Sequence, residues 1–228
     1  MYDVNFSTRA VLLSSLAGAV AVPQEVRLTM FAPSGHLLAM SCTEYDAGAS
    51  SPNYLGAHNS LLIRWADVSP TTGPDPTNWK PELTNTAGFL YLQSGTNIVA
   101  AAHAKQETLV WTDISLNSLQ YLGTAEVFGV QEIDNGTTIF GQNVVASANN
   151  VIYWMGNDKF YTYNGRVDTL PCTLRQYIFE DLNRQQGQIA FAATNNQFNE
   201  IVWFYCSSNS TEIDRYVIYN YADNIWYY

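Results

Sequence analysis

Residues 151–165 have the sequence VIYWMGNDKFYTYNG. An apolar run ends at Trp154, polar residues follow, and a second run, Phe160–Tyr163, leads into Asn164-Gly165. Aromatic and β-branched residues favour strands, and Asn-Gly favours a tight hairpin because both positions take φ > 0 in such a turn. The stretch therefore predicts two consecutive strands that end in a hairpin turn.

The same pattern recurs along the chain. Apolar runs end at four tryptophans, with intervals of 46 (65 to 111), 43 (111 to 154) and 49 (154 to 203) residues: Trp65, Trp111, Trp154 and Trp203. A period of about 40–50 residues with several strands per unit is typical of β-propeller blades. We therefore expect these tryptophans to occupy equivalent blade positions. Chance spacing in a β-sandwich, which also has short strands and close turns, is the alternative.

Composition supports a fold built of strands. The chain has 228 residues, of which only 13% are charged and 14% are aromatic, and this balance suits strands and turns better than exposed helices. We expect an all-β fold that resembles a β-propeller, either small or partial. One short helix is predicted over 174–185, because Thr173 and Gln176 fit a capping box and Gly187 would end the helix.

Turn residues make two further predictions. Asn135-Gly136 predicts a tight hairpin between strands at 128–133 and 137–140. The stretch 69–81 contains four prolines and Gly73, so it cannot be a central strand and is expected to form a long exposed loop.

The N-terminal stretch 10–22, AVLLSSLAGAVAV, is the longest apolar run. It is too short to span a bilayer. It fits a buried strand or short helix, and it also fits a signal peptide with a cleavage site at 19–21. We expect two parts: an N-terminal segment of uncertain role over 1–22, and a propeller-like domain over 23–228 with no interdomain linker.

Motifs for catalysis are missing from the sequence. It has no nucleophile elbow, no phosphate-binding glycine-rich loop and no His-Glu-x-x-His. His36, His58 and His103 are expected to be ordinary hydrogen-bonded histidines, and three scattered cysteines fit neither a disulfide scaffold nor a metal site. We therefore expect a protein without enzymatic activity, catalytic residues, cofactor or metal.

Two aspartates recur with the tryptophans. Asp67 and Asp113 each stand two positions after one of them. Such a pair can act as acid and base in glycoside hydrolysis at the mouth of a propeller. A residue that repeats with the blade is better explained as a structural device, in which the carboxylate accepts backbone hydrogen bonds in a turn. We expect the structural role.

Several strand and turn strings are similar to those of one protein family. They are IRWAD (63–67), LVWTD (109–113), LQYLG (119–123), VIYWM (151–155), FYTYNG (160–165), FNEIVWFY (198–205) and DRYVIYNY (214–221), together with Trp79, Pro81, Asn85, Ala87, Gly88 and Trp226. Over residues 23–228 the chain resembles the tail nozzle proteins of short-tailed bacteriophages, also called tail tubular or packaged-DNA stabilisation proteins.

The resemblance implies a structural virion protein in the phage tail, made in the host cytoplasm. It implies a ring of six copies that contacts the adaptor and portal-proximal tail proteins, with duplex DNA passing through the channel without sequence-specific binding and with no membrane contact. Members of the family are longer, so this chain is expected to be a fragment or a minimal version, with a propeller that is incomplete or completed by another chain. No functional residue is carried over, because the role depends on ring geometry.

Charge is compatible with that role. The 10 Lys and Arg against 20 Asp and Glu give a net charge of −10. Proteins that grip nucleic acid through its phosphates need clustered cations, whereas an acidic channel lets a duplex slide. The acidity also serves the solubility of a free subunit. The alternative function is a propeller that binds or hydrolyses glycans for host-surface recognition, because Tyr, Trp, Asp and Asn are abundant.

Overall fold

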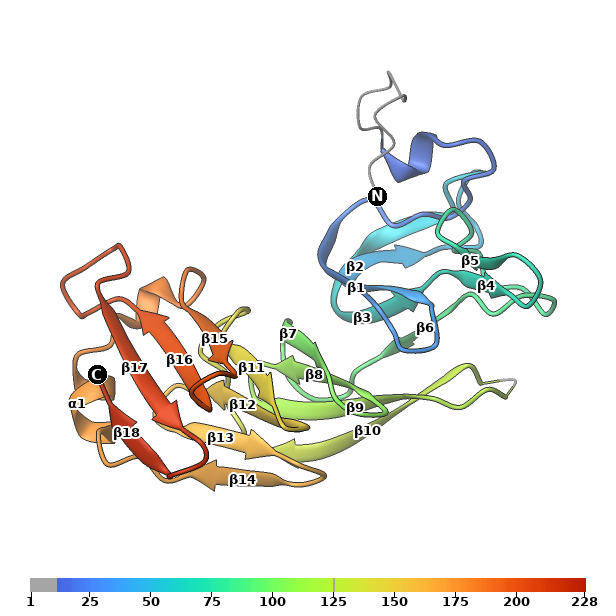
Figure 1. Cartoon of the computed structure of the whole chain (residues 1–228). Coiled ribbons are helices and arrows are strands. Elements are labelled where there is room, and N and C mark those ends of the chain that lie inside the picture. Colours follow the sequence, from blue (N-terminus) through green and yellow to red (C-terminus); the bar gives the residue numbers. More distant parts are fainter. Residues whose placement is uncertain (1–11, 125) are drawn as a thin grey trace, which may run out of the picture. The chain divides into compact units, whose positions relative to one another are not determined.

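The computed structural model describes residues 12–124 and 126–228. These residues form eighteen strands, one α-helix and two short 3₁₀ turns, Leu13–Ser15 and Arg184–Gln186 (Figure 1). The all-β prediction is confirmed, although no closed propeller is detected in this part of the chain. The chain divides into two compact units, Met1–Tyr91 and Leu92–Tyr228, and each is described by itself.

The first unit contains one four-stranded antiparallel sheet and a small hairpin. The sheet has the order β1 (Val26–Phe31), β2 (Leu37–Tyr45), β3 (Leu55–Trp65) and β6 (Gly88–Tyr91). The hairpin pairs β4 (Asp67–Ser69) with β5 (Gly73–Asp75) and lies in the chain between β3 and β6. Part of the stretch 69–81 is therefore paired rather than a free loop.

The described end of the N-terminal segment packs into this unit. Ala21 and Val22 are buried in one apolar cluster with Trp79, which comes from the proline-rich stretch. The backbone N–H of Trp79 donates to the carbonyl of Val20 at 3.0 Å. The prediction of a fully exposed loop over 69–81 was wrong, because its end carries a large aromatic side chain that is more stable in the core than in water. Residues 1–11 of the segment lie outside the described residues.

A buried arginine joins three segments of the first unit. The Arg64 side chain is 0% exposed. Its guanidinium donates to the carbonyls of Thr43 at 3.0 Å, Ala21 at 2.6 Å and Trp79 at 3.1 Å. Burial lowers its pKa from the usual value, yet a guanidinium stays charged in proteins. The cation is thus solvated by backbone carbonyls, and it ties the N-terminal segment and the proline-rich stretch to the sheet.

The second unit contains three four-stranded antiparallel meanders. The first pairs β7 (Ile98–His103), β8 (Thr108–Thr112), β9 (Ser115–Tyr121) and β10 (Phe128–Asn135). The next pairs β11 (Val145–Ala148), β12 (Val151–Met155), β13 (Phe160–Tyr163) and β14 (Val167–Leu170). The last pairs β15 (Phe191–Asn195), β16 (Glu200–Tyr205), β17 (Arg215–Asn220) and β18 (Ile225–Tyr227).

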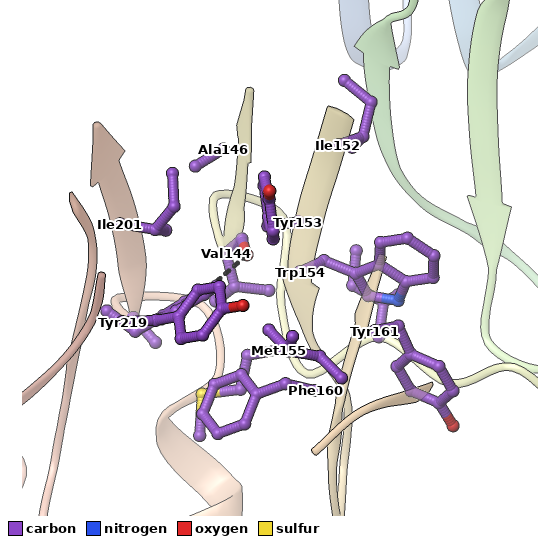
Figure 2. Packing of buried hydrophobic residues seen from close by; sticks show 14 of the residues in the cluster. Val144, Ala146, Ile152, Tyr153, Trp154, Met155, Phe160, Tyr161, Ile201 and Tyr219 are labelled. Carbon is purple, nitrogen blue, oxygen red and sulfur yellow. Dashed lines mark hydrogen bonds between the residues drawn. The ribbon is translucent and has the colours of Figure 1, made fainter. Parts of the chain in front are cut away.

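The three meanders share one continuous hydrophobic core. The first strands of the last two sheets, β11 and β15, lie next to each other, and the backbone N–H of Ala192 donates to the carbonyl of Asn143 at 2.8 Å where they meet. In Figure 2, Trp154 and Tyr161 lie on one side of β12, and Tyr219 lies on the other. The middle sheet is therefore covered on both faces by its neighbours in this unit.

Two local predictions need correction. The helix exists, but α1 is shorter than expected, Arg175–Glu180, and its N-terminus has no side-chain cap. The hairpin at Asn135-Gly136 was wrong: β10 pairs only with β9, and 137–140 is not a strand but leads to the next sheet, with the Phe140 N–H bonded to the carbonyl of Met155. The Asn164-Gly165 hairpin between β13 and β14 is present, with Gly165 at φ +107°.

Candidate functional site

The four tryptophans do not all occupy equivalent positions. Trp111, Trp154 and Trp203 are fully buried in β8, β12 and β16, the second strand of each meander. Trp65 ends β3, which is the third strand of its sheet, so its expected equivalence was wrong. What Trp65 does share with the other three tryptophans is pairing with the following strand of its sheet, where Gly88 lies opposite Trp65.

The faces on which the three buried indoles lie also differ. Trp203 contacts Phe160 of the preceding sheet, with ring centroids 4.8 Å apart, and donates its indole N–H to the carbonyl of Val144 at 3.0 Å. Trp154 contacts Trp111 of the preceding sheet, with ring centroids 5.3 Å apart. Trp111 therefore faces the following sheet, and its buried indole N–H has no hydrogen-bond partner among the described residues. All three fill contacts between sheets, where a large aromatic contributes most to stability.

Asp67 and Asp113 accept backbone hydrogen bonds, but from distant segments rather than within the turn that follows each strand. Asp67 accepts hydrogen bonds from the backbone N–H and hydroxyl of Thr86, both at 2.8 Å. Asp113 accepts the same two bonds from Thr96, at 2.7 and 2.9 Å. Each aspartate thus fastens a segment beside the end of a tryptophan strand. The two aspartates belong to different units.

The histidines and cysteines do not form a reactive cluster either. His36 is buried between the hydroxyls of Ser34 and Thr86, at 2.9 and 3.1 Å, and burial lowers its pKa. The three cysteines are free, and burial raises the pKa of Cys42 to about 12. Within residues 12–124 and 126–228, no group of three His, Cys, Asp or Glu is placed to hold a metal ion.

A polar hollow of about 650 Å³ lies in the second unit, on the face of the β7–β10 sheet that also carries Trp111. Its walls come from the β7–β8 turn, from β9 and β10, and from the end of β13. The residues that line it include Gln106, Glu107, Ser118, Gln120, Gln131 and Tyr163. Most of them are amides or hydroxyls, which can both donate and accept hydrogen bonds.

Glu107 is the central residue of a hydrogen-bond network in the wall of this hollow. Its Oε1 accepts a hydrogen bond from the hydroxyl of Tyr163 at 2.6 Å, and its Oε2 accepts from the hydroxyl of Ser118 and from Nε2 of Gln120. Burial and the neighbouring carboxylate raise the pKa of Tyr163 well above its usual range, so Tyr163 remains a donor at neutral pH. The carboxylate is thereby held in one orientation by three donors.

A second hollow of about 460 Å³ adjoins the first. The two share Gln106, Glu107, Tyr163 and Gly165. The remaining wall is formed by residues of three turns: Lys105 in the β7–β8 turn, Asn149-Asn150 in the β11–β12 turn and Asn164 in the β13–β14 turn. Asn149 and Asn150 have φ of +51° and +63°, conformations that asparagine tolerates better than most residues. Together the hollows form a continuous polar groove with Glu107 and Tyr163 in its middle.

The outer face of the last sheet carries a cluster of apolar and aromatic side chains. We call it the aromatic face: Phe191, Val202, Phe204, Tyr216, Ile218 and Tyr227, which point away from the buried Trp203 side of the sheet. Phe191, Phe204 and Tyr216 lie opposite one another across three strands, with Phe191 and Phe204 stacked at 4.7 Å. Tyr216 is 48% exposed. Contiguous exposed apolar patches are typical of interaction surfaces.

Sequence reasoning missed both of these surfaces. The pattern Glu200–Tyr205, EIVWFY, is apolar at consecutive positions, which indicates a strand buried on both faces, so it was a signal for the aromatic face. The groove had no such signal, because Glu107, Gln131 and Tyr163 are far apart in the chain and belong to no motif. They meet only because two sheets stack.

Comparisons with known proteins do not assign the chain to a family. No protein-family model matches this chain, and no curated protein matches it. In the part of the chain that the structure describes, no helix is long and apolar enough to cross a membrane.

Proposed function

We propose that this protein is a non-enzymatic structural subunit of a phage virion, which forms a closed ring in the tail nozzle or tube through which DNA is retained and ejected. The four four-stranded sheets would be blades of a propeller that another copy or chain completes. The adaptor and portal-proximal tail proteins would be its neighbours. The proposal starts from the strand and turn strings similar to those of tail nozzle proteins.

The observation that carries the proposal is the aromatic face. Within the second unit, each apolar sheet face between neighbouring meanders is covered by the next meander, and Trp203, Phe160 and Trp154 fill these contacts. The outer face of the last meander is also rich in aromatic and aliphatic side chains, but Tyr216 and Phe191 remain partly exposed. A neighbouring subunit would remove this apolar surface from water, which stabilises the assembly by roughly 25 cal/mol per Å² of area buried.

A ring also agrees with the charge. Six copies with a net charge of −10 each would carry −60, so confinement rather than attraction would hold the duplex in the channel. Ring closure follows from the kind of contact, because a head-to-tail contact between copies either closes or continues into a filament.

Native mass spectrometry and electron microscopy of the purified chain test the assembly. We expect closed rings, and we expect Tyr216→Glu to shift the population to monomers because a charge would have to be buried in the contact. Leu83→Glu is the matched control, since Leu83 is fully exposed in the first unit, and it should leave the rings intact. A wild-type chain that stays monomeric, or a virion micrograph that places it on outer fibres, would contradict the proposal.

An electrophoretic mobility shift at about 0.15 M salt tests the relation to DNA. Few phosphate contacts can form with 10 basic residues against 20 acidic ones, and each contact adds salt-dependent affinity through counterion release. We expect no binding of duplex DNA by the free subunit. Micromolar binding that weakens steeply with salt would assign the protein to the nucleic-acid-binding class instead.

A further inference from the structure

We propose that the polar groove around Glu107 and Tyr163 is a binding site for an uncharged oligosaccharide. This function is separate from the structural role proposed above and uses a different part of the second unit. Both hollows of the groove are formed by residues between Ala104 and Gly165, so the site lies within one compact unit.

The chemistry of the walls favours a ligand with many hydroxyl groups. Gln106, Gln120 and Gln131 present side-chain amides, and Ser118 presents a hydroxyl. Each of these groups can donate and accept, as each sugar hydroxyl does. An apolar ligand would need mostly hydrophobic walls, which this groove does not have. Tyr121, which also lines the groove and is about half exposed, offers an aromatic edge for the apolar face of a sugar ring.

The charges of the walls argue against an anionic ligand. Among the described residues that line the groove, Lys105 is the single cation, and it lies at the second hollow, whereas Glu107 and Glu132 line the first. Phosphate, sulfate and carboxylate groups are recognised by clustered arginine and lysine. An uncharged ligand avoids repulsion by the two carboxylates and can donate hydroxyl hydrogen bonds to Glu107.

The central carboxylate is arranged before any ligand binds. Tyr163, Ser118 and Gln120 donate to Glu107, and an ionised carboxylate has about four acceptor positions. These three donors leave Glu107 with capacity for a ligand hydroxyl. Because the side chain is held in place by these donors, less conformational entropy is lost on binding.

The size of the groove indicates more than one sugar unit. The hollows measure about 650 and 460 Å³ and share the wall formed by Glu107 and Tyr163. Both values lie in the range of ordinary ligand pockets of roughly 300–1,000 Å³. An oligosaccharide can place consecutive units on the two sides of the shared wall, one against Gln131 and the other against the Asn149-Asn150 turn.

An array of uncharged and anionic oligosaccharides, followed by titration calorimetry of each glycan that binds, tests the proposal on the full chain. We expect binding of uncharged glycans, with affinity reduced at least about tenfold in Gln131→Ala and in Glu107→Gln, because hydrogen bonds to the ligand are lost. Gln131 is exposed and is not among the donors to Glu107, so its variant is expected to fold normally.

Gln197→Ala is the matched control, because Gln197 is exposed in the turn between β15 and β16 and does not line either hollow of the groove. It should bind as the wild type does. Binding of no uncharged glycan, preferential binding of the anionic ones, or equal affinity in Gln131→Ala and the wild type would each overturn the proposal. The rings expected above should form in Gln131→Ala, so the two proposals can fail separately.

Discussion

The two units of the chain are stabilised by different kinds of interaction. In the second unit, aromatic side chains fill the contacts between stacked meanders. The ring centroid of Trp203 lies 4.8 Å from that of Phe160 and 5.8 Å from that of Trp226. In the first unit, the segments outside the sheet are joined by the buried guanidinium of Arg64, which donates to three backbone carbonyls. The second unit depends on apolar contact area, whereas in the first unit a buried polar anchor adds to an apolar cluster that includes Trp79.

This difference predicts different responses to substitution. Apolar contacts can be weakened gradually, because a smaller apolar side chain loses area and leaves a cavity. A buried hydrogen-bonded cation responds more abruptly, because its removal leaves several carbonyls without partners. The predictions that follow test this contrast.

The largest effect is expected for Trp154→Ala in the second unit. Trp154 is fully buried, stacks on Tyr161 at 5.2 Å and contacts Trp111. Its loss should lower the free energy of unfolding by about 3–5 kcal/mol, the usual range for a buried aromatic truncated to alanine. Chemical denaturation measures this, and hydrogen exchange should show the loss of protection in β12 and β13. A change below about 1 kcal/mol would mean that the indole is not a core residue.

A comparable but smaller effect is expected for Arg64→Met in the first unit. The methionine keeps part of the side-chain volume but donates no hydrogen bond, so the carbonyls of Ala21, Thr43 and Trp79 lose a partner. We expect destabilisation by about 2–4 kcal/mol, with increased hydrogen exchange around Ala21 and Trp79. Arg64→Lys, which keeps the charge but has a shorter reach and no fork, should recover only part of the loss. Full stability in Arg64→Met would remove the contrast between the units.

The ability to predict these features from sequence follows the same contrast. The repeated strand with a terminal tryptophan predicted the all-β fold and three of the stacked positions, because apolar side chains at regular intervals reflect a local rule of strand formation. The predicted equivalence of Trp65 was wrong, because its sheet has an additional preceding strand, β1, that the spacing of the tryptophans does not reveal. Trp111 contacts the sheet that follows it, whereas Trp154 contacts the sheet that precedes it. This difference could not be predicted either, since it depends on how two sheets stack.

The long-range polar contacts could not be predicted from the sequence, for a physical reason. Arg64 reaches Ala21, 43 residues away in the chain, and Tyr163 reaches Glu107 across 56 residues. Neither spacing corresponds to a helical or strand period, and neither pair belongs to a motif. A structural role for Asp67 and Asp113 could be predicted because both stand at the end of a tryptophan strand, but their partners Thr86 and Thr96, 19 and 17 residues away, could not.

A moderate effect on the free energy of unfolding is expected when the threonine partners of the two aspartates are replaced. Thr86 donates to Asp67 and also accepts from the backbone N–H of Val68 at 2.8 Å, whereas Thr96 is exposed and bonds Asp113. We expect Thr86→Val to cost about 1–2 kcal/mol and Thr96→Val less than about 1 kcal/mol, because lost bonds of buried groups are more costly than lost bonds of exposed ones. Equal costs in denaturant titrations would show that burial does not separate the two contacts.

The smallest effect concerns the acid dependence of the Asp113 contact. Partial burial alone would raise the pKa of this carboxyl, but the hydrogen bonds from Thr96, with smaller ones from the backbones of Asn97 and Asp113, outweigh it, so the pKa lies below its ordinary value of 3.8. A carboxyl with a lowered pKa in the folded state adds stability that is fully present above the ordinary value and is lost as the pH falls through the folded value. We therefore expect Asp113→Asn to be less stable than the wild type at pH 5–7, by about 1 kcal/mol or less because the site is partly exposed to solvent.

The decisive observation is the pH dependence of that difference. Denaturant titrations should show the gap between wild type and Asp113→Asn narrowing below about pH 4, as the wild-type carboxylate becomes protonated and its contact with Thr96 weakens. Asp223→Asn is the matched control, since Asp223 is exposed in the turn before β18, and its difference from the wild type should stay near zero throughout. A gap for Asp113→Asn that widens in acid would mean that the folded state raises the pKa, and that burial rather than the Thr96 contact dominates at this strand end.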